Sequence, residues 1–555
     1  MDPITNDRSE GRFEDPDYVS PSDVLRAWLG IARRDPRWFW IVVALWGVGA
    51  IPFFASTTFI GDDHLFLAFS RYESNPLSAL WADKHGGEFY RPIPMLVWWL
   101  LGRLPMAIRH PAFASLSLLL HTVVGIEVGL LVGCLRGATG SLHRHDDGLT
   151  RNARADWQVS ALAAGFFLVL PFPREAAYWF SASTDLFATA FGLAAILSLL
   201  GAAPRRGWLA FALGCWCKET AVVFPLLAAI SIRVHTPARG WANTARRIAP
   251  ALPIVAAYAG VRTWVLHGLG NSGDTAASLA GRAVQIGAGL LSGLSGAEPL
   301  STSVAAGLGA VLFVALIVAR VQQLRRSPCN AGTFRWALLW IALAVSPLLG
   351  ARWVVGARYF YVSAVAICAL LAEVASAWPI RWRVAILAGF SGLAFAQAVS
   401  RRPDIVAYDL RVGAARRAVV DGLSHGARVF HIAAGIKDLD LAVKESDDVE
   451  PWDASSLILG DVPASFVALP QQGSHVSSND LDFLLAHPSL PPSGAYRFGA
   501  RKIVGLARRG DDPTLDEVLK AFPDIRFIRL RPGPGHRVIY RDITETWLRE
   551  NADVD

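Results

Sequence analysis

The sequence has little cysteine and little charge for a chain of 555 residues. Its five cysteines all precede residue 370 and lie in or beside apolar runs, which excludes the disulfide framework of a small secreted domain. Cys215 and Cys217 have one residue between them and no histidine nearby, so we expect no structural zinc. Charged residues make up 18% of the chain and hydrophobic residues 53%. This balance argues against a soluble enzyme and favours a polytopic membrane protein.

The basic charge of the chain does not indicate a nucleic-acid partner. The formal net charge is +7, but the arginines fall mainly in short loops between apolar runs, where positive charge sets membrane topology. The 20 tryptophans suit indoles placed at bilayer interfaces. Because residues 1–37 are polar and the next apolar run is long enough to remain as a helix, we expect no cleavable signal peptide.

Apolar runs of about the length that crosses a bilayer recur up to residue 400. A membrane-spanning helix needs about 20 such residues. The runs lie at 38–58, 111–135, 157–173, 184–203, 248–266, 302–321, 335–350, 358–377 and 384–400. The stretch 207–232 is also apolar but contains Lys218-Glu219 at its centre, which predicts two short helices or one broken helix.

The basic loops predict the orientation of these spans. If the basic loops are cytoplasmic, the chain has about 11 spans, with its N-terminus inside and its C-terminus outside. The outer segments are then 59–110, 174–183, 267–301 and 351–357. Residues 91–106 are apolar, bounded by proline and too short to span, which is typical of an interfacial helix.

The predicted fold is therefore a polytopic α-helical membrane protein with a C-terminal soluble α/β domain. The cytoplasmic tail is 1–37, the transmembrane domain is 38–400 with the outer loop 59–110, and the extracytoplasmic domain is 401–555. In the last part, runs near 427–433 and 525–530 resemble strands, and 405–423 and 513–521 resemble helices. We expect an inner-membrane protein whose outer face is periplasmic.

Adjacent carboxylates at the outer end of the first apolar run are the strongest candidate catalytic feature. Asp62 and Asp63, followed by His64, repel each other and lose hydration near lipid. A carboxylate there can act as general base for a hydroxyl acceptor. The alternative is a solvated pair that caps a turn.

Other charged and aromatic residues recur at the predicted outer ends of the spans. Arg91, after Tyr90, suits a bidentate hold on phosphate or carboxylate, although an arginine can also extend to lipid headgroups. Arg352 and Arg358, with Tyr359, are further candidates for contacting lipid phosphate. Their alternative role is an interfacial belt of aromatic and basic side chains.

Glu175, Asp185 and Lys218 complete the candidate set for binding substrate. Glu175 and Asp185 are expected near the same face as Asp62, although Asp185 could simply cap the next helix. Lys218 lies inside an apolar run, where a charge must be paired or face a cavity. Either Glu219 neutralises it, or it faces a lipid phosphate.

In order along the chain, these motifs resemble the GT-C superfamily of membrane glycosyltransferases. The nearest patterns are those of protein O-mannosyltransferases and of transmembrane-and-TPR-repeat O-mannosyltransferases. The matching motifs are Asp62-Asp63, Tyr90-Arg91-Pro92, Ser117-Leu-Leu-Leu-His121, Pro171-x-x-x-Glu175 with Asp185, Lys218-Glu219 and Arg358-Tyr359-x-Tyr361. They cover roughly residues 38–380, but Arg174 stands where the family often has histidine, and no TPR repeats follow.

The resemblance implies inverting transfer of a sugar from polyprenyl phosphate to a hydroxyl on the outer side. Asp62 or Asp63 would be the base, and the acceptor could be a glycan, a lipid or a protein. We expect no cofactor. A divalent metal is the alternative, with Asp62, Asp63, Glu175 and Asp185 as ligands. The rival functions are a lipid-linked glycan flippase or transporter, and a scaffold for envelope assembly.

Overall fold

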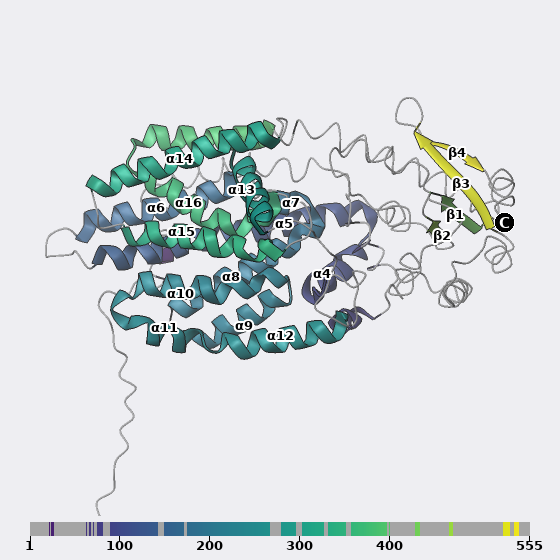
Figure 1. Cartoon of the computed structure of the whole chain (residues 1–555), viewed down its shortest axis with the longest axis horizontal. Coiled ribbons are helices and arrows are strands. Elements are labelled where there is room, and N and C mark those ends of the chain that lie inside the picture. The colour runs from purple at the N-terminus through teal and green to yellow at the C-terminus, as the bar shows by residue number, and fades with distance from the viewer. Residues whose placement is uncertain are drawn as a thin grey trace, which may run out of the picture.

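The computed structural model gives the arrangement of most of the helical part and of four strands (Figure 1). The structure describes residues 21–22, 24–26, 63, 66–67, 70, 75–81, 89–141, 149–170, 175–201, 203–266, 279–295, 302–326, 331–350, 357–396, 399, 428–432, 466–469, 525–532 and 538–542. The first predicted span, 38–58, lies outside this part, as do Asp62, His64 and Arg352.

The described part of residues 75–396 is almost entirely helical. In chain order the labelled elements are η1 (Pro76–Leu80), α4 (Pro92–Gly102), α5 (Met106–Ser141), α6 (Leu149–Val169), α7 (Glu175–Tyr178), η3 (Phe180–Ala182), α8 (Ser183–Leu200), α9 (Pro204–Cys215), η4 (Glu219–Val223), α10 (Phe224–His235), η5 (Pro237–Arg239), α11 (Gly240–Ile248), α12 (Ala251–Leu266), α13 (Leu279–Ser295), α14 (Thr302–Arg326), α15 (Ala331–Val345), η7 (Ser346–Gly350), η8 (Ala357–Phe360) and α16 (Tyr361–Ser376). A further helix covers 380–396.

Six helical stretches in the described part are long and apolar enough to cross a membrane. They are Ala107–Gly137, Phe180–Leu200, Gly240–Leu266, Val304–Arg325, Ala331–Leu349 and Arg358–Ser376. Each overlaps one of the predicted runs, and Pro92–Gly102 and Trp157–Val169 are shorter apolar helices. The protein is therefore a helical membrane protein by length and composition. The count of about 11 spans stays a prediction.

The interrupted stretch 207–232 forms two short helices, one of the two forms that the charged pair in its centre predicted. Helix α9 ends at Cys215, and α10 begins at Phe224, with Pro225 in its first turn. Between them, the backbone of Lys218 is extended. With 12 residues each, the two helices are about 18 Å long, shorter than the bilayer core. The turn between them carries both charges of the pair.

The core of the bundle lies between α5, α6, α8, α10 and α16. Figure 1 shows α5, α6, α8 and α16 running roughly alongside one another. Close approach is made possible by glycine. Gly192 of α8 packs against the ring of Phe224, and a side chain there would collide with it. Gly125 of α5 leaves room in the same way for Leu168 of α6.

A buried ionic network joins three helices beyond the hydrophobic core. Glu373 of α16 lies 2.7 Å from Arg136 of α5 and 3.2 Å from Arg320 of α14. Both Glu373 and Arg320 are 1% exposed. Arg320 also donates to the Gln323 side chain at 2.6 Å. The network sits near the C-terminal end of each helix, and so at the other end of α16 from Tyr361.

Residues 428–542 contribute a four-stranded sheet. Its order is β2 (Phe466–Leu469), β1 (Arg428–Ile432), β3 (Ile525–Pro532) and β4 (Val538–Asp542). Strand β1 is parallel to β2 and β3, while β3 and β4 are antiparallel. The strand predictions near 427–433 and 525–530 are confirmed. The predicted helices 405–423 and 513–521 lie outside the described residues.

Of the helices that lie in the predicted outer segments, α4 was predicted from the sequence, and α13 was not. Helix α4 occupies most of the predicted interfacial helix 91–106, starting at Pro92. Helix α13 lies within 267–301, where no helix was expected. Figure 1 shows α13 steeply inclined to α14, against which it packs.

Candidate functional site

Lys218 forms the centre of a buried polar cluster at the turn between α9 and α10. Its ammonium group donates to both carboxylate oxygens of Asp185, each at 2.6 Å. Lys218 is 3% exposed and Asp185 8%. The ammonium also lies 4.9 Å from the centre of the Tyr359 ring. Burial and double coordination make this pair expensive to break, because either partner alone would be a buried charge.

Asp185 lies in the first turn of α8, but capping does not explain its position. The helix is preceded by Ala182, which makes no side-chain capping bond, and both Asp185 oxygens are directed at Lys218. A negative charge in the first turn is also favoured by the helix dipole. The capping interpretation of Asp185 is therefore replaced by a tertiary ion pair.

Glu219 pairs with Arg91 instead of neutralising its neighbour Lys218. Arg91 donates from Nη2 at 2.7 Å and from Nε at 3.2 Å, which is the bidentate geometry expected of a guanidinium group. Arg262 of α12 lies 3.9 Å from the same carboxylate. Burial alone would raise the pKa of Glu219, but the charge and hydrogen bonds of Arg91 outweigh it and hold that pKa at about 2.

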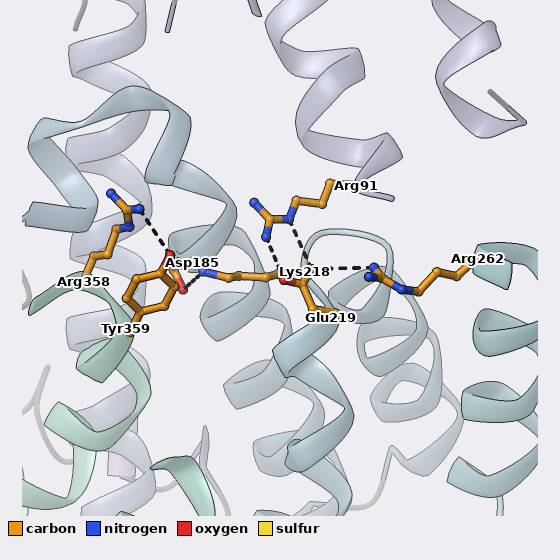
Figure 2. A network of polar contacts seen from close by, with 7 residues as sticks. All are labelled: Arg91, Asp185, Lys218, Glu219, Arg262, Arg358 and Tyr359. Atoms are coloured by element: carbon orange, nitrogen blue, oxygen red, sulfur yellow. Dashed lines mark hydrogen bonds and ion pairs between the residues drawn. The ribbon is translucent and has the colours of Figure 1, made fainter. Parts of the chain in front are cut away.

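The consecutive residues Lys218 and Glu219 thus bind partners on opposite sides of the turn, as Figure 2 shows. Lys218 reaches towards α8 and η8, while Glu219 reaches towards Arg91 and α12. The backbone reinforces this arrangement, because Ile93 at the start of α4 donates its N–H to the Trp216 carbonyl at 3.3 Å. The turn therefore connects the outer loop with three separate helices.

Arg358 lies next to the Lys218–Asp185 pair and is held by aromatic rings. Its guanidinium carbon is 3.9 Å from the centre of the Trp179 ring and 4.9 Å from that of Tyr359. It also donates to the Tyr359 hydroxyl at 3.2 Å. Stacking of this kind fixes the plane of an arginine while leaving its charge intact.

Asp63 is completely buried and serves as an anchor. Its Oδ1 accepts the backbone N–H of Ser181, in η3, at 2.6 Å. Ser181 precedes Asp185 by four residues, so the acidic motif packs where α8 begins. Nearby, Phe66 contacts Trp98 edge-on, and both belong to a small apolar cluster that includes Phe180. These contacts attach the outer loop to η3, directly before α8.

Tyr90 and Phe89 fix the entry of the chain into α4. The Tyr90 hydroxyl donates to the Leu80 carbonyl at 2.7 Å, and the Tyr90 ring lies 6.3 Å from that of Tyr258. The guanidinium group of Arg91 sits 4.1 Å above the Phe89 ring. These contacts orient Arg91 towards Glu219.

The structure thus brings together six of the predicted site residues: Tyr90, Arg91, Asp185, Lys218, Arg358 and Tyr359. A seventh, Asp63, binds Ser181, four residues before Asp185. Asp62, His64 and Arg352 lie outside the described residues, and only the backbone of Glu175, at the start of α7, is described.

Three residues of the cluster were missed by the sequence-based selection: Glu219, Trp179 and Arg262. Arg262 is a charge within the apolar run 248–266, so the rule that charges in spans are functional would have found it. Trp179 gave no signal, because an outer-loop tryptophan is also expected at an interface.

Within the described residues, no group of three or more histidine, cysteine or acidic side chains is placed to hold a metal. Two of the four carboxylates named for a metal, Asp62 and Glu175, have no described side chain. Both oxygens of Asp185, a third, accept hydrogen bonds from the ammonium group of Lys218. The metal hypothesis therefore stays a prediction.

The cluster carries an excess of positive charge. Four of the seven residues in Figure 2 are basic, and two, Asp185 and Glu219, are acidic. Adding Asp63 still leaves one more basic group than acidic ones. Cationic groups gathered near the end of a membrane helix are suited to an anionic ligand.

The Arg91–Glu219 ion pair should make the stability of the protein depend on pH. The folded-state pKa of Glu219 is about 2, below the ordinary 4.5, so its stabilisation is complete above about pH 4.5 and is lost as the pH falls towards 2. The difference in melting temperature between wild type and Glu219→Gln should therefore be constant from about pH 8 to 5 and shrink below about 4.5. Thermal melts across this range test it, and a difference that changes between pH 8 and 5 contradicts the assignment.

Comparison with known proteins returned no match to any family model, to any curated protein or to any solved structure.

Proposed function

We propose that the protein is a GT-C-like membrane glycosyltransferase that moves a sugar from a polyprenyl phosphate to a hydroxyl acceptor on the extracytoplasmic face. The observation that carries the proposal is the net positive, largely buried cluster around Lys218 and Asp185. Asp63 binds the backbone of Ser181, four residues before Asp185. The reaction needs positive charge to hold an anionic lipid headgroup and a carboxylate to act as base, and the cluster and the Asp62-Asp63 motif are proposed to supply them.

The basic residues are proposed to hold the donor phosphate. Arg358 presents a stacked, oriented guanidinium group, and Lys218 adds a charge beside it. Arg91 is tied to Glu219 and shapes the opposite wall of the site, with Tyr90 fixing its backbone. Tyr359 offers an aromatic ring between the cations. Glu175, Asp185 and Arg352 are proposed to line the substrate site.

The proposed reaction is a direct displacement at the sugar C1. The acceptor hydroxyl oxygen attacks C1 while the bond from C1 to the phosphate oxygen breaks, and its electron pair stays with the polyprenyl phosphate. Asp62 takes the acceptor proton, and His64 is proposed to orient Asp62. We assign the role of base to Asp62, because Asp63 is fully buried and its Oδ1 accepts the N–H of Ser181.

The proposal includes the finer architecture predicted from sequence. About 11 spans would place the site at the periplasmic side of an inner membrane, with the N-terminal tail cytoplasmic. The C-terminal residues, whose sheet includes parallel β1 and β3, would form an extracytoplasmic α/β domain beside the acceptor. A domain on the extracytoplasmic side would be able to contact the acceptor.

The test is reconstitution with a radiolabelled polyprenyl-phosphate sugar. Label that moves from the lipid fraction to a hydroxyl acceptor supports transferase activity. Label that crosses the bilayer while still attached to the lipid identifies a flippase instead, and the proposal is then wrong.

Arg358→Gln should raise the KM for the donor about 10- to 100-fold, because it removes a charged contact to phosphate worth roughly 1.5–3 kcal/mol. The matched control is Arg246→Gln, which changes an exposed arginine of α11 and should leave KM unchanged. Steady-state kinetics over a range of donor concentration measures both. Equal KM values in the two variants contradict the role of Arg358.

A further inference from the structure

A histidine and a tyrosine are hydrogen-bonded within the bundle, and neither has a part in the proposed reaction. His121 of α5 is 2% exposed and Tyr361 of α16 is fully buried. The Nδ1 atom of His121 lies 2.8 Å from the Tyr361 hydroxyl oxygen. His121 ends the Ser117-Leu-Leu-Leu-His121 motif, whose purpose the charged cluster leaves unexplained.

A third ring restricts the movement of both side chains. Phe167 of α6 meets the Tyr361 ring edge-on, with centres 5.1 Å apart, and its centre lies 5.4 Å from that of His121. The pair is buried and Phe167 packs against both of its rings. Loss of the His121–Tyr361 hydrogen bond would leave buried polar atoms without that partner, which costs free energy. The packing also fixes the orientation of both side chains.

The position of Tyr361 in the chain connects this pair to the site. Tyr361 is the first residue of α16 and directly follows η8, which carries Arg358 and Tyr359. A second bond fixes the same turn from α15, where Trp340 Nε1 donates to the Val362 carbonyl at 2.8 Å. The start of α16 is thus held from α5 and from α15.

We propose that His121 is a positioning residue. Its bond to Tyr361 sets the rotation of the start of α16, and so places the Tyr359 ring against the Lys218 ammonium group and Arg358 over Trp179. The consequence for the donor phosphate rests on the proposed function, whereas the placement of Tyr359 does not. The competing explanation is a core pair that adds stability alone.

The placement is tested without activity by ¹⁹F NMR of the full-length protein in detergent, with 3-fluorotyrosine incorporated at position 359. The resonance senses the nearby ammonium charge. Tyr361→Phe, which removes only the hydroxyl, and His121→Leu should both shift or broaden it. His121→Asn should restore the wild-type signal, because an asparagine amide reaches the position of Nδ1. A label at Tyr258, on α12, is the control and should not respond. An unchanged signal at 359 in Tyr361→Phe overturns the proposal.

Kinetics then tests the consequence for the donor. Tyr361→Phe and His121→Leu should raise the donor KM about tenfold with kcat nearly unchanged, and His121→Asn should recover it. A merely stabilising pair would change neither value in protein that remains folded. If the resonance shifts but KM does not, the link to the donor is wrong. If wild type transfers no sugar, the proposed function fails, while the NMR result still decides the positioning role.

Discussion

Asp62→Asn is expected to lower kcat for sugar transfer about 10²- to 10⁴-fold, the usual contribution of a general base. Asparagine preserves the size of the side chain but cannot accept the proton of the acceptor hydroxyl. The donor KM should change little, because Lys218 and Arg358, not Asp62, are proposed to hold the phosphate. Single-turnover measurements with labelled donor separate the two effects. Full turnover in this variant would remove Asp62 from the mechanism.

Asp63→Asn supplies the matched control for this experiment. The asparagine carbonyl can still accept the N–H of Ser181, so the local fold should persist. If Asp63 is an anchor and Asp62 the base, the loss of kcat should be clearly smaller in Asp63→Asn than in Asp62→Asn. The reverse order would exchange the two roles.

Glu373→Gln is expected to destabilise the protein by about 3–5 kcal/mol, the range for breaking a buried ion pair by removing one partner. Glu373 compensates Arg136 and Arg320, and both Glu373 and Arg320 are 1% exposed. Without the carboxylate, two guanidinium groups repel each other between α5, α14 and α16. Tryptophan fluorescence during thermal unfolding in detergent measures the loss.

The control removes the whole network rather than one member. Combining Glu373→Leu with Arg136→Met and Arg320→Met leaves no uncompensated charge, and should recover most of the lost stability. If Glu373→Gln melts at the wild-type temperature, the network contributes nothing to holding these three helices together.

The sequence predicted those helices and strands whose signals lie within a short stretch of residues. Apolar length predicted the six stretches able to cross a membrane. The charges of Lys218 and Glu219 predicted the break between α9 and α10, because an ionised pair cannot continue a lipid-facing helix. β-branched and aromatic residues predicted β1 and β3. Helix α13 was missed, because a helix within a loop need not be long enough to span.

The partners of the charged residues were decided only by the tertiary structure. From sequence, Lys218 and Glu219 could neutralise each other, and Asp185 could cap α8. Instead, Lys218 pairs with Asp185, 33 residues away, and Glu219 with Arg91, 128 residues away. Such pairs form where helix packing brings distant groups together and excludes water, which strengthens their attraction. The sequence by itself determined that these charges lie at helix ends, and packing determined which of them meet.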